Sequence, residues 1–497
     1  MDQDLRSIQQ ARDMAVKARE AARAWAHASQ EEVDRAIAAM SQAARRAAPE
    51  LSKLAVEVTG YGRADHKLVK DLFNAVDVYE AIARLRTVGV ISSGGDAGVV
   101  EIAEPMGAIA ALIPTTNPVS TVFFKGLISV KARNAVVMAP HPRAAPASLA
   151  ATKVLTDALA SVGAPDNLIQ CMSEIDLTGT QELWSHWAID LVLATGSLAM
   201  VKAAYASGKP TYAVGPGNVP SFIHESVADL GEAVAGTITS STFDYGTPCA
   251  SEQAVIVDRP LASRARASFE EHGARFLART EADRLASVLI TAKGGINPEI
   301  VGQSPQTLAE KAGIRVDPST TILVVEPGGV GRDYPLSMEI LTSIIKWYEA
   351  SDIEGGTSLA QDLLRYGGDG HTAAIWAADQ RAAASYAAQV RAFRVMINTP
   401  SCFGAMGGTA GVSPSFMLGT GTWGGTITAD NIGPLHLINR KRVARGVRDW
   451  RELLSGSDQH PSGLARSTRS GQMMAEDLVH RVLERLGQVP SGVGGGR

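Results

Sequence analysis

Short apolar runs alternate with segments of helical period from Val99 onward, and this alternation constrains the fold more than any other feature. The runs are AIAALIP, NAVVMAP, LVLATG and PTYAVGP, and the helical segments between them lie near 120–132, 147–162 and 198–207. Strands that alternate with helices indicate βαβ units, in which helices cover both faces of a parallel sheet. The sequence therefore predicts an α/β protein.

A second series of the same kind follows Gly231. It contains the strand AVIVD, two helices between Ala262 and Ala286, the strand TTILVVE and a helix expected over 338–348. A chain of 497 residues is long enough for two or three domains. We therefore expect a first domain over 1–230, with an additional strand near 97–106, and a second domain over 231–415.

The two ends of the chain have their own patterns. Ser29 and Glu32 form a capping box that begins a helix through Met40, within an alanine-rich segment. Residues 416–443 have paired-strand character around GTWGG, and 455–471 is a polar, turn-rich linker. An amphipathic helix is expected over 472–487, where the apolar stripe consists of Met474, Leu478, Val479, Val482, Leu483 and Leu486.

Charge and apolar content exclude several classes of partner. The chain has 47 Lys and Arg against 51 Asp and Glu, without a long basic block, so we expect neither nucleic acid nor an anionic membrane surface as a partner. The N-terminus lacks an apolar signal region, and no run approaches the roughly 18 apolar residues of a spanning helix. We expect no metal site. Three cysteines cannot all pair, which favours a reducing cytoplasm.

Cys249 differs from the other two cysteines in its context. Free cysteines are commonly buried and inert, and this is the interpretation for Cys171 and Cys402. Cys249 lies in DYGTPCASEQ, where a loop of small residues leads into a strand and would let a substrate approach. This context alone leaves a reactive thiol and a core thiol as equal alternatives.

Three segments decide between them by resemblance. NPVSTVFFKGLISVKARNAVVMAPHPRA, LATGSLAMVKAAYASGKPTYAVGPGNVP and DYGTPCASEQ together resemble the CoA-acylating branch of the aldehyde dehydrogenase superfamily, in consistent order from about Ala11 to Trp450. The resemblance implies two doubly wound α/β domains and a β-hairpin oligomerisation arm. It implies that 1–230 binds NAD and CoA, that 231–415 carries the nucleophile, and that 416–454 forms the arm and its return.

The resemblance also implies roles for individual residues. Cys249 matches the nucleophile, whose thiolate adds to an aldehyde to form a thiohemiacetal. Asn117 matches the asparagine whose amide, with the Cys249 backbone N–H, stabilises the oxyanion; the alternative for TTNP is a plain turn after a strand. The residues implied in cofactor binding are Pro114, Thr115, Thr195, Gly196, Ser197 and Glu339. For Glu339 the alternative is a solvated glutamate in a first helical turn.

One departure from the hydrolytic members of the superfamily is informative. Where those enzymes carry the glutamate that activates water, this chain has Val214, so a thiol such as CoA must discharge the thioester. The residues expected to bind adenosine are also replaced, near Ala139 and Pro142. The expected reaction converts propionaldehyde or acetaldehyde, NAD⁺ and CoA to acyl-CoA and NADH. The alternatives are an acylating sulfoacetaldehyde dehydrogenase and a CoA-independent hydrolytic enzyme.

Two protein partners are implied as well. VVEIAEP and the ITADNIGPLHLI region match the arm through which the family forms dimers, so a homodimer or homotetramer is expected. The 472–487 helix is similar to the encapsulation helices that carry enzymes into bacterial microcompartments, which predicts contact with shell proteins and a cytoplasmic location inside such a compartment. Its alternative is a helix that packs on its own enzyme body.

Overall fold

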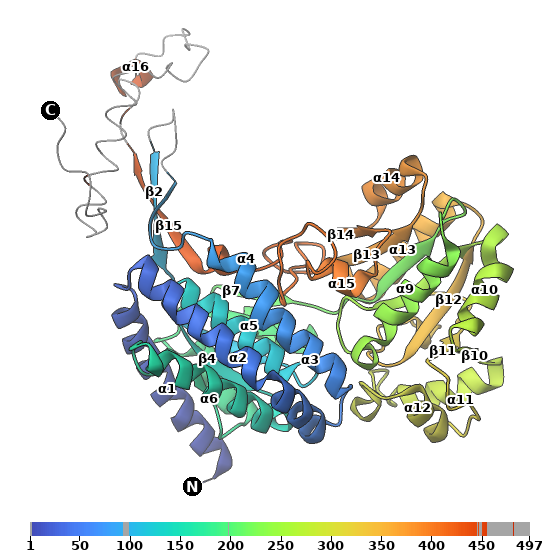
Figure 1. Cartoon of the computed structure of the whole chain (residues 1–497), viewed down its shortest axis with the longest axis horizontal. Helices are drawn as coiled ribbons and strands as arrows, with labels where there is room; N and C mark the ends of the chain where they lie inside the picture. The colour runs from blue at the N-terminus through green and yellow to red at the C-terminus, as the bar shows by residue number, and fades with distance from the viewer. Residues whose placement is uncertain are drawn as a thin grey trace.

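The structure is a computed structural model that describes residues 2–92, 99–196, 198–444, 446, 450–454 and 481. Two α/β bodies lie side by side, and a narrow antiparallel arm projects from the first of them (Figure 1). The predicted α/β class is confirmed. Both large sheets are parallel throughout, as the alternation of strands and helices requires.

The first body is built on a five-stranded sheet of order β5-β4-β3-β6-β7. Because the order reverses between β3 and β6, the loops after these two strands open a crevice at the carboxyl edge, where α/β sheets bind ligands. The strands are β3 Ala108–Ile113, β4 Ala135–Pro140, β5 Ile169–Cys171, β6 Leu191–Thr195 and β7 Thr211–Val214. The helices are α5 Pro118–Lys131, α6 Ala145–Ser161, α7 Leu177–Ser185 and α8 Leu198–Ala206.

N-terminal helices cover this sheet. The predicted capping box of Ser29 and Glu32 is present, and the helix it begins continues past Met40 to Thr59, where Gly60 in the left-handed region (φ 69°) ends it. This long helix contacts α3, α5 and α6. The helices are α1 Gln3–Trp25, α2 Gln30–Thr59, α3 Ala64–Leu72, the π-helical turn η1 Phe73–Val78 and α4 Tyr79–Ala83.

The second body is built on a seven-stranded sheet of order β10-β11-β12-β9-β8-β13-β14. The strands are β8 Val219–Ile223, β9 Glu252–Asp258, β10 Ala274–Phe276, β11 Ile322–Val325, β12 Ile344–Ala350, β13 Gly370–Trp376 and β14 Ala392–Ile397. The helices are α9 Leu230–Thr242, α10 Ala262–Glu271, α11 Arg279–Leu289, α12 Pro305–Lys311, α13 Ile353–Gly367, α14 Gln380–Gln389 and α15 Ser401–Ala405. The chain passes from one sheet to the other across 215–218, so β8, which the 1–230 range placed in the first domain, belongs to the second sheet.

The helix predicted over 338–348 is wrong. Residues 338–343 are irregular with bends, and 344–350 form β12, which pairs with β9 on one side and β11 on the other. Isoleucine, tryptophan and tyrosine in IIKWYEA fit the pleated surface of a strand that is buried on both faces. The apolar spacing also fits a helix, and the pairing with two distant strands decides between the two.

The arm is a three-stranded antiparallel sheet of order β1-β2-β15, formed by Gly89–Ser92, Val99–Pro105 and Ile438–Ala444. VVEIAEP forms the central arm strand. Of ITADNIGPLHLI only the last residue, Ile438, enters the arm, where it begins β15 opposite Pro105, and the rest is loop and the 3₁₀ turn η8 Pro434–Leu437. GTWGG is a turn, and the nearby pairing is one isolated bridge between Leu418 and Asn431. The short helix α16 Trp450–Leu454 follows, and the predicted linker 455–471 and helix 472–487 lie outside the described residues except for Arg481.

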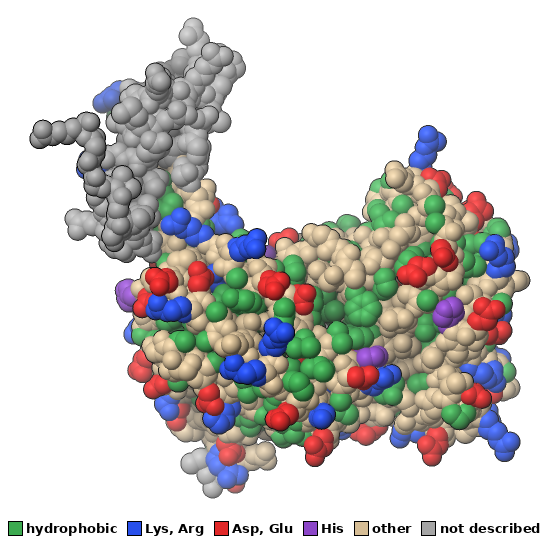
Figure 2. All heavy atoms as spheres, viewed as in Figure 1, with side chains coloured by type: hydrophobic (Ala, Val, Ile, Leu, Met, Phe, Trp, Pro, Cys, Tyr) green, Lys and Arg blue, Asp and Glu red, His purple; other side chains and the backbone are tan. Residues whose placement is uncertain are grey.

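The surface and the helices add two observations. Figure 2 shows positive and negative side chains interspersed over the visible face of the described residues. Within the ranges that the structure describes, no helix is long and apolar enough to cross a membrane, and no group of three or more His, Cys, Asp or Glu is arranged to hold a metal ion.

Candidate active site

A narrow cavity of about 50 Å³ lies where the two bodies meet. Its walls come from the carboxyl ends of β3, β6 and β7 on the first body and from the segment that enters β9 on the second. The lining residues are Asn117, Thr121, Thr195, Val214, Pro248, Cys249, Ala250, Met406, Phe416 and Leu418. The structure thus brings together four positions that the sequence singled out: Cys249, Asn117, Thr195 and Val214.

The chain reaches Cys249 through an unusual turn. Asp244, Tyr245 and Gly246 have φ of 51°, 50° and 70°, so three consecutive residues lie in the left-handed region, two of them with a Cβ. Such residues are costly and persist where the surroundings hold them. Gly217, in the 215–218 link, packs against the backbone carbonyl of Cys249. A Cβ at this position would lie 1.8 Å from the carbonyl oxygen. A side chain at 217 would therefore displace the nucleophile.

A histidine that the sequence analysis missed faces the thiol. His371 Nε2 lies 3.2 Å from Cys249 Sγ, and its Nδ1 lies 2.9 Å from Thr372 Oγ1. His371 opens β13 after the glycine-rich loop RYGGDGH, and it is fully buried. A titratable residue between a glycine-rich loop and a buried apolar strand was the available signal, but nothing local connects it with a cysteine 122 residues away.

Burial determines the electrostatics of this pair. It raises the pKa of Cys249 to about 12, and Glu339 adds to the rise while the Arg394 guanidinium opposes it. Burial, with a smaller effect of Arg394, holds the pKa of His371 well below its usual value. Both groups are therefore neutral at rest. A neutral imidazole beside a thiol is arranged to accept the thiol proton as the sulfur attacks a substrate.

Asn117 ends the loop between β3 and α5. Its Nδ2 donates to Thr116 Oγ1 at 3.1 Å, and its Oδ1 accepts from the Lys70 ammonium. Although Asn117 is the N-cap residue of α5, its side chain makes no capping hydrogen bond to that helix. Asn117 instead lines the cavity between the two bodies.

The residues implied in cofactor binding are divided. Thr195 lines the cavity, and its buried Oγ1 has no hydrogen-bond partner among the described residues. Gly196 follows it at the end of β6, whereas Ser197 lies outside the described residues. Pro114 and Thr115 are partly buried in the loop after β3 but do not line the cavity.

Glu339 lies in an irregular loop segment, not in a helix. Its Oε1 accepts the backbone N–H of Gly217 at 2.6 Å, and burial raises its pKa while that N–H opposes the rise. The alternative of a solvated glutamate in a first helical turn is therefore wrong. Glu339 is partly exposed and braces the link that packs against Cys249.

The other two cysteines lie away from this cavity. Cys171 and Cys402 are free and buried, as the sequence analysis expected. Burial raises the pKa of the Cys171 thiol to about 12, and it also raises the pKa of Cys402. Neither thiol lines the cavity beside His371.

The two parallel-sheet bodies meet at a partly buried cysteine, with a neutral histidine and an asparagine beside it. This arrangement fits an enzyme in which a thiol attacks a carbonyl carbon. Comparison with known protein families identifies the class of enzyme. The model of the aldehyde dehydrogenase family matches residues 4–284, and the chain belongs to this family.

Relatives of known function place it near the acylating members. An aldehyde-alcohol dehydrogenase of Clostridium acetobutylicum is 39 % identical over 431 residues, which are 86 % of this chain and 50 % of that protein. The acylating sulfoacetaldehyde dehydrogenase of Cupriavidus necator is 35 % identical over 437 residues, which are 86 % of this chain and 87 % of that protein. This chain spans about half the length of the aldehyde-alcohol dehydrogenases it matches.

Solved structures agree with the fold. An acetylating aldehyde dehydrogenase from Geobacillus thermoglucosidasius has a TM-score of 0.88 and 44 % identity over 90 % of this chain and 99 % of its own. A Rhodopseudomonas palustris propionaldehyde dehydrogenase with bound propionyl-CoA has a TM-score of 0.79 and 26 % identity over 87 % and 93 % of the two chains. A propionaldehyde dehydrogenase from a fucose-utilisation microcompartment of Clostridium phytofermentans has a TM-score of 0.78 and 26 % identity, over 87 % and 96 %. The aldehyde dehydrogenase fold is confirmed.

Proposed function

We propose that the chain is a CoA-acylating aldehyde dehydrogenase, which converts a short-chain aldehyde, NAD⁺ and CoA to acyl-CoA and NADH. The observation that carries the proposal is the cavity in which Cys249, 3.2 Å from His371, meets Asn117 and the apolar Val214. Nucleophile, proton acceptor and oxyanion donor are all present, and the water-activating carboxylate of the hydrolytic enzymes is absent from the described lining.

The acylation half of the reaction uses Cys249, His371 and Asn117. As Cys249 Sγ bonds to the aldehyde carbon, its proton passes to His371 Nε2. The carbonyl oxygen gains negative charge and accepts hydrogen bonds from the Asn117 amide and the Cys249 backbone N–H. Return of that proton from His371 to the oxygen gives the thiohemiacetal. As hydride leaves the carbon, the hydroxyl proton passes back to His371 and the Cys249 thioester forms. His371 then releases the proton to solvent and is neutral again.

The residues near the cavity fit a nicotinamide cofactor. The unpartnered Thr195 Oγ1, buried at the carboxyl end of β6, is a polar group that a bound ligand would satisfy. Gly196 follows it at the position where the sheet order reverses. Pro114 and Thr115 in the loop after β3, and Glu339 beside the 215–218 link, would complete the site together with Ser197. NAD⁺, when bound, accepts the hydride.

The last step, release of the acyl group from Cys249, can use either CoA or water as the nucleophile, and the cavity favours CoA. Val214 is 4 % exposed and lines the cavity, so no carboxylate at this position can activate water. The CoA thiol attacks the acyl carbon, its proton passes to His371, and Cys249 leaves and is reprotonated. The test is NADH formation from aldehyde and NAD⁺ with and without CoA. Sustained turnover without CoA, with release of the free acid, would show the hydrolytic alternative instead.

The cavity favours an uncharged aldehyde. Met406, Phe416 and Leu418 form its apolar wall, and none of the ten described lining residues is a lysine or arginine. A sulfonate would be stabilised by a cation at this wall. We therefore infer that propionaldehyde or acetaldehyde is preferred over sulfoacetaldehyde, although an acylating sulfoacetaldehyde dehydrogenase is a relative. A comparison of kcat/KM for the three aldehydes tests this order.

We propose that the chain forms a homodimer or homotetramer through the arm. The arm sheet projects from the first body (Figure 1), and the apolar cluster within it is small, formed by Val90, Val100, Ile102 and Val443. A small sheet with exposed edges is stabilised when another chain covers it. Sedimentation over a series of concentrations tests the proposal. A single species at 52.2 kDa throughout the micromolar range would contradict it.

We further propose that 472–487 directs the enzyme into a microcompartment shell in the cytoplasm. Support comes from the amphipathic sequence and from the microcompartment origin of one solved relative. Residues 465–497 fused to a fluorescent protein should localise to co-expressed shells, while the chain without them should keep its soluble activity. Diffuse fluorescence beside intact shells, or failure of the shortened chain to fold, would favour a helix that packs on its own body.

A further inference from the structure

Asn117 does not use its side chain as an N-cap residue normally does. Such an asparagine accepts a hydrogen bond from a backbone N–H in the first turn of its helix. Here the oxygen that would cap α5 accepts from Lys70, and α5 begins without that bond. The amide of Asn117 is therefore oriented by a different element, the helix α3.

Lys70 is buried in a site with three acceptors. Its side chain is 1 % exposed, and its Nζ donates to Asn117 Oδ1, to Asp244 Oδ2 and, at 3.3 Å, to Thr247 Oγ1. An ammonium has three hydrogens and no acceptor, so this set satisfies it completely. Burial lowers the pKa of Lys70 to about 8 while Asp244 opposes the change, so the group is an ammonium at neutral pH.

The chemistry of an ammonium fixes the orientation of the amide. Because Lys70 can only donate, the amide must present its oxygen to Lys70 and its NH₂ group to the opposite side. One hydrogen of that NH₂ group goes to Thr116 Oγ1. The other has no partner among the described residues, and Asn117 lines the cavity at Cys249.

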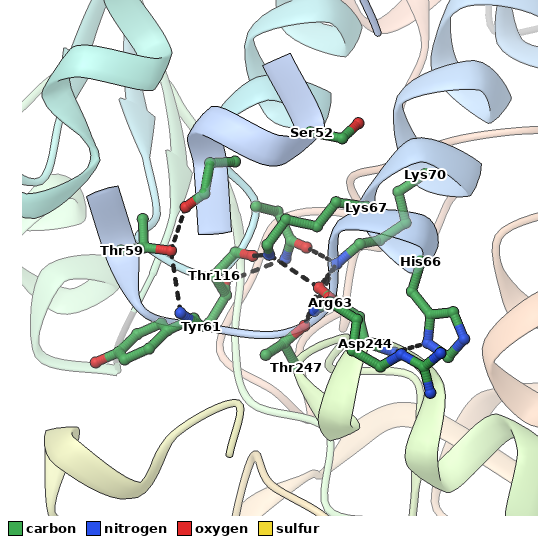
Figure 3. A network of polar contacts seen from close by, with 12 residues as sticks. Ser52, Thr59, Tyr61, Arg63, His66, Lys67, Lys70, Thr116, Asp244 and Thr247 are labelled. Atoms are coloured by element: carbon green, nitrogen blue, oxygen red, sulfur yellow. Dashed lines mark hydrogen bonds and ion pairs between the residues drawn. The ribbon is translucent and has the colours of Figure 1, made fainter. Parts of the chain in front are cut away.

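The same ammonium holds the chain that leads to the nucleophile. Asp244, at the start of the left-handed turn, also accepts from the Arg63 N–H and from Thr247 Oγ1, both at 2.7 Å, and from Lys67 at 3.0 Å. Figure 3 shows Lys67 and Lys70 converging from the helix on Asp244 and Thr247. Lys70 thus connects the amide on the first body to the segment just before Cys249 on the second.

We propose that Lys70 is a positioning residue for the oxyanion site. It holds the Asn117 amide so that one N–H is directed at the developing oxyanion, which also accepts from the Cys249 backbone N–H. This inference rests on the proposed function and deepens it. Without Lys70 the amide is free to turn over and cap α5 with its oxygen. The transition state for attack by Cys249 then loses one of its two donors.

The test compares Lys70→Met with Lys67→Met. Lys67 is also buried, at 3 % exposed, and it binds the same carboxylate of Asp244 and the Thr116 carbonyl, but the hydrogen bonds of the Asn117 side chain go to Lys70 and Thr116 and not to Lys67. Removal of one oxyanion donor lowers kcat by about 10²–10³-fold, so loss of its orientation should lower the rate of the first turnover at least ~10-fold. The KM for aldehyde should change by less than about threefold, because the donor acts in the transition state. Lys67→Met should lose stability with little loss of that rate.

A double-mutant cycle with Asn117→Ala separates positioning from general disruption. If Lys70 acts through the amide, Lys70→Met should slow Asn117→Ala by less than about threefold. Equal rate losses in the two lysine variants, or the same loss with and without Asn117, would overturn the proposal. If Lys70→Met does not fold, Lys70→Gln is measured in the same cycle and judged in the same way. Absence of CoA-dependent turnover in the wild type would refute the proposed function, whereas full turnover by folded Lys70→Met would refute this inference alone.

Discussion

A carboxylate at position 214 should convert the acylating enzyme into one that also hydrolyses its thioester. Val214 ends β7 next to Thr195, and it lines the cavity of about 50 Å³ that contains Cys249. A water molecule needs roughly 10–15 Å³ of such space, so water has room to reach the acyl carbon. What the wild type lacks is a base to activate it.

The structure also sets the size of the effect. General-base catalysis contributes about 10²–10⁴-fold, and burial should move the pKa of the new carboxyl toward neutrality, where a base works best. We expect release of free acid without CoA to rise about 100-fold in Val214→Glu, which corresponds to about 2.7 kcal/mol of barrier. The buried valine is lost at the same time, so the free energy of unfolding should fall by about 2–4 kcal/mol.

The assay measures acid and NADH formed from propionaldehyde and NAD⁺ with CoA omitted. Val214→Gln is the matched control, because it has nearly the same shape without a base. Circular dichroism and a thermal melt establish that both variants are folded. Equal acid release by the folded Glu and Gln variants would refute the reasoning, because it would show that geometry and not the absence of a base protects the thioester.

Three further predictions follow from the same site and its supports. Cys249→Ala should abolish NADH formation and remain folded, whereas Cys402→Ala should keep substantial turnover; residual aldehyde oxidation by Cys249→Ala would contradict the assignment. His371→Gln should lower kcat by about 10²–10⁴-fold. In the wild type, the depressed pKa of His371 should keep kcat/KM high below pH 6.5, and a fall centred at pH 6.5 would show an ordinary histidine. Burial raises the pKa of Asp71 to about 7, above its value of about 3.9 in the unfolded chain, so the free energy of unfolding should fall as pH rises between these values. Asp71→Asn keeps the acceptor for Ser52 and should reduce that fall in urea unfolding at pH 5 and 8, while the buried Glu252 carboxyl, whose pKa is also raised to about 7, keeps part of it.

The sequence predicted the parts of the molecule that depend on local pattern or on motifs of contiguous residues. The strands and helices of the first body follow from alternating runs, and the resemblance carried Cys249, Asn117 and Val214 to positions that share one cavity. Their juxtaposition required the family comparison, because they lie on three separate loops or strands.

What the sequence did not predict depends on contacts between distant segments. The segment 344–350 became a strand because β9 and β11 pair with it. His371 meets Cys249 across 122 residues, and Lys70 meets Asp244 across 174. From sequence alone, a lysine on a helix is expected to be solvated. Only the tertiary structure shows that a buried carboxylate from the other body contacts Lys70.

The buried, neutral state of the Cys249 thiol also determines how the resting enzyme withstands oxidants. Peroxide and electrophiles react with thiolates, and at pH 7 a thiol with a pKa of about 12 is ionised in only about one molecule in 10⁵. A free cysteine with a pKa near 8.5 is ionised in roughly one molecule in 30. The Cys249 thiol therefore reacts slowly with oxidants between turnovers. It becomes a strong nucleophile only when a carbonyl carbon lies beside it and His371 takes its proton.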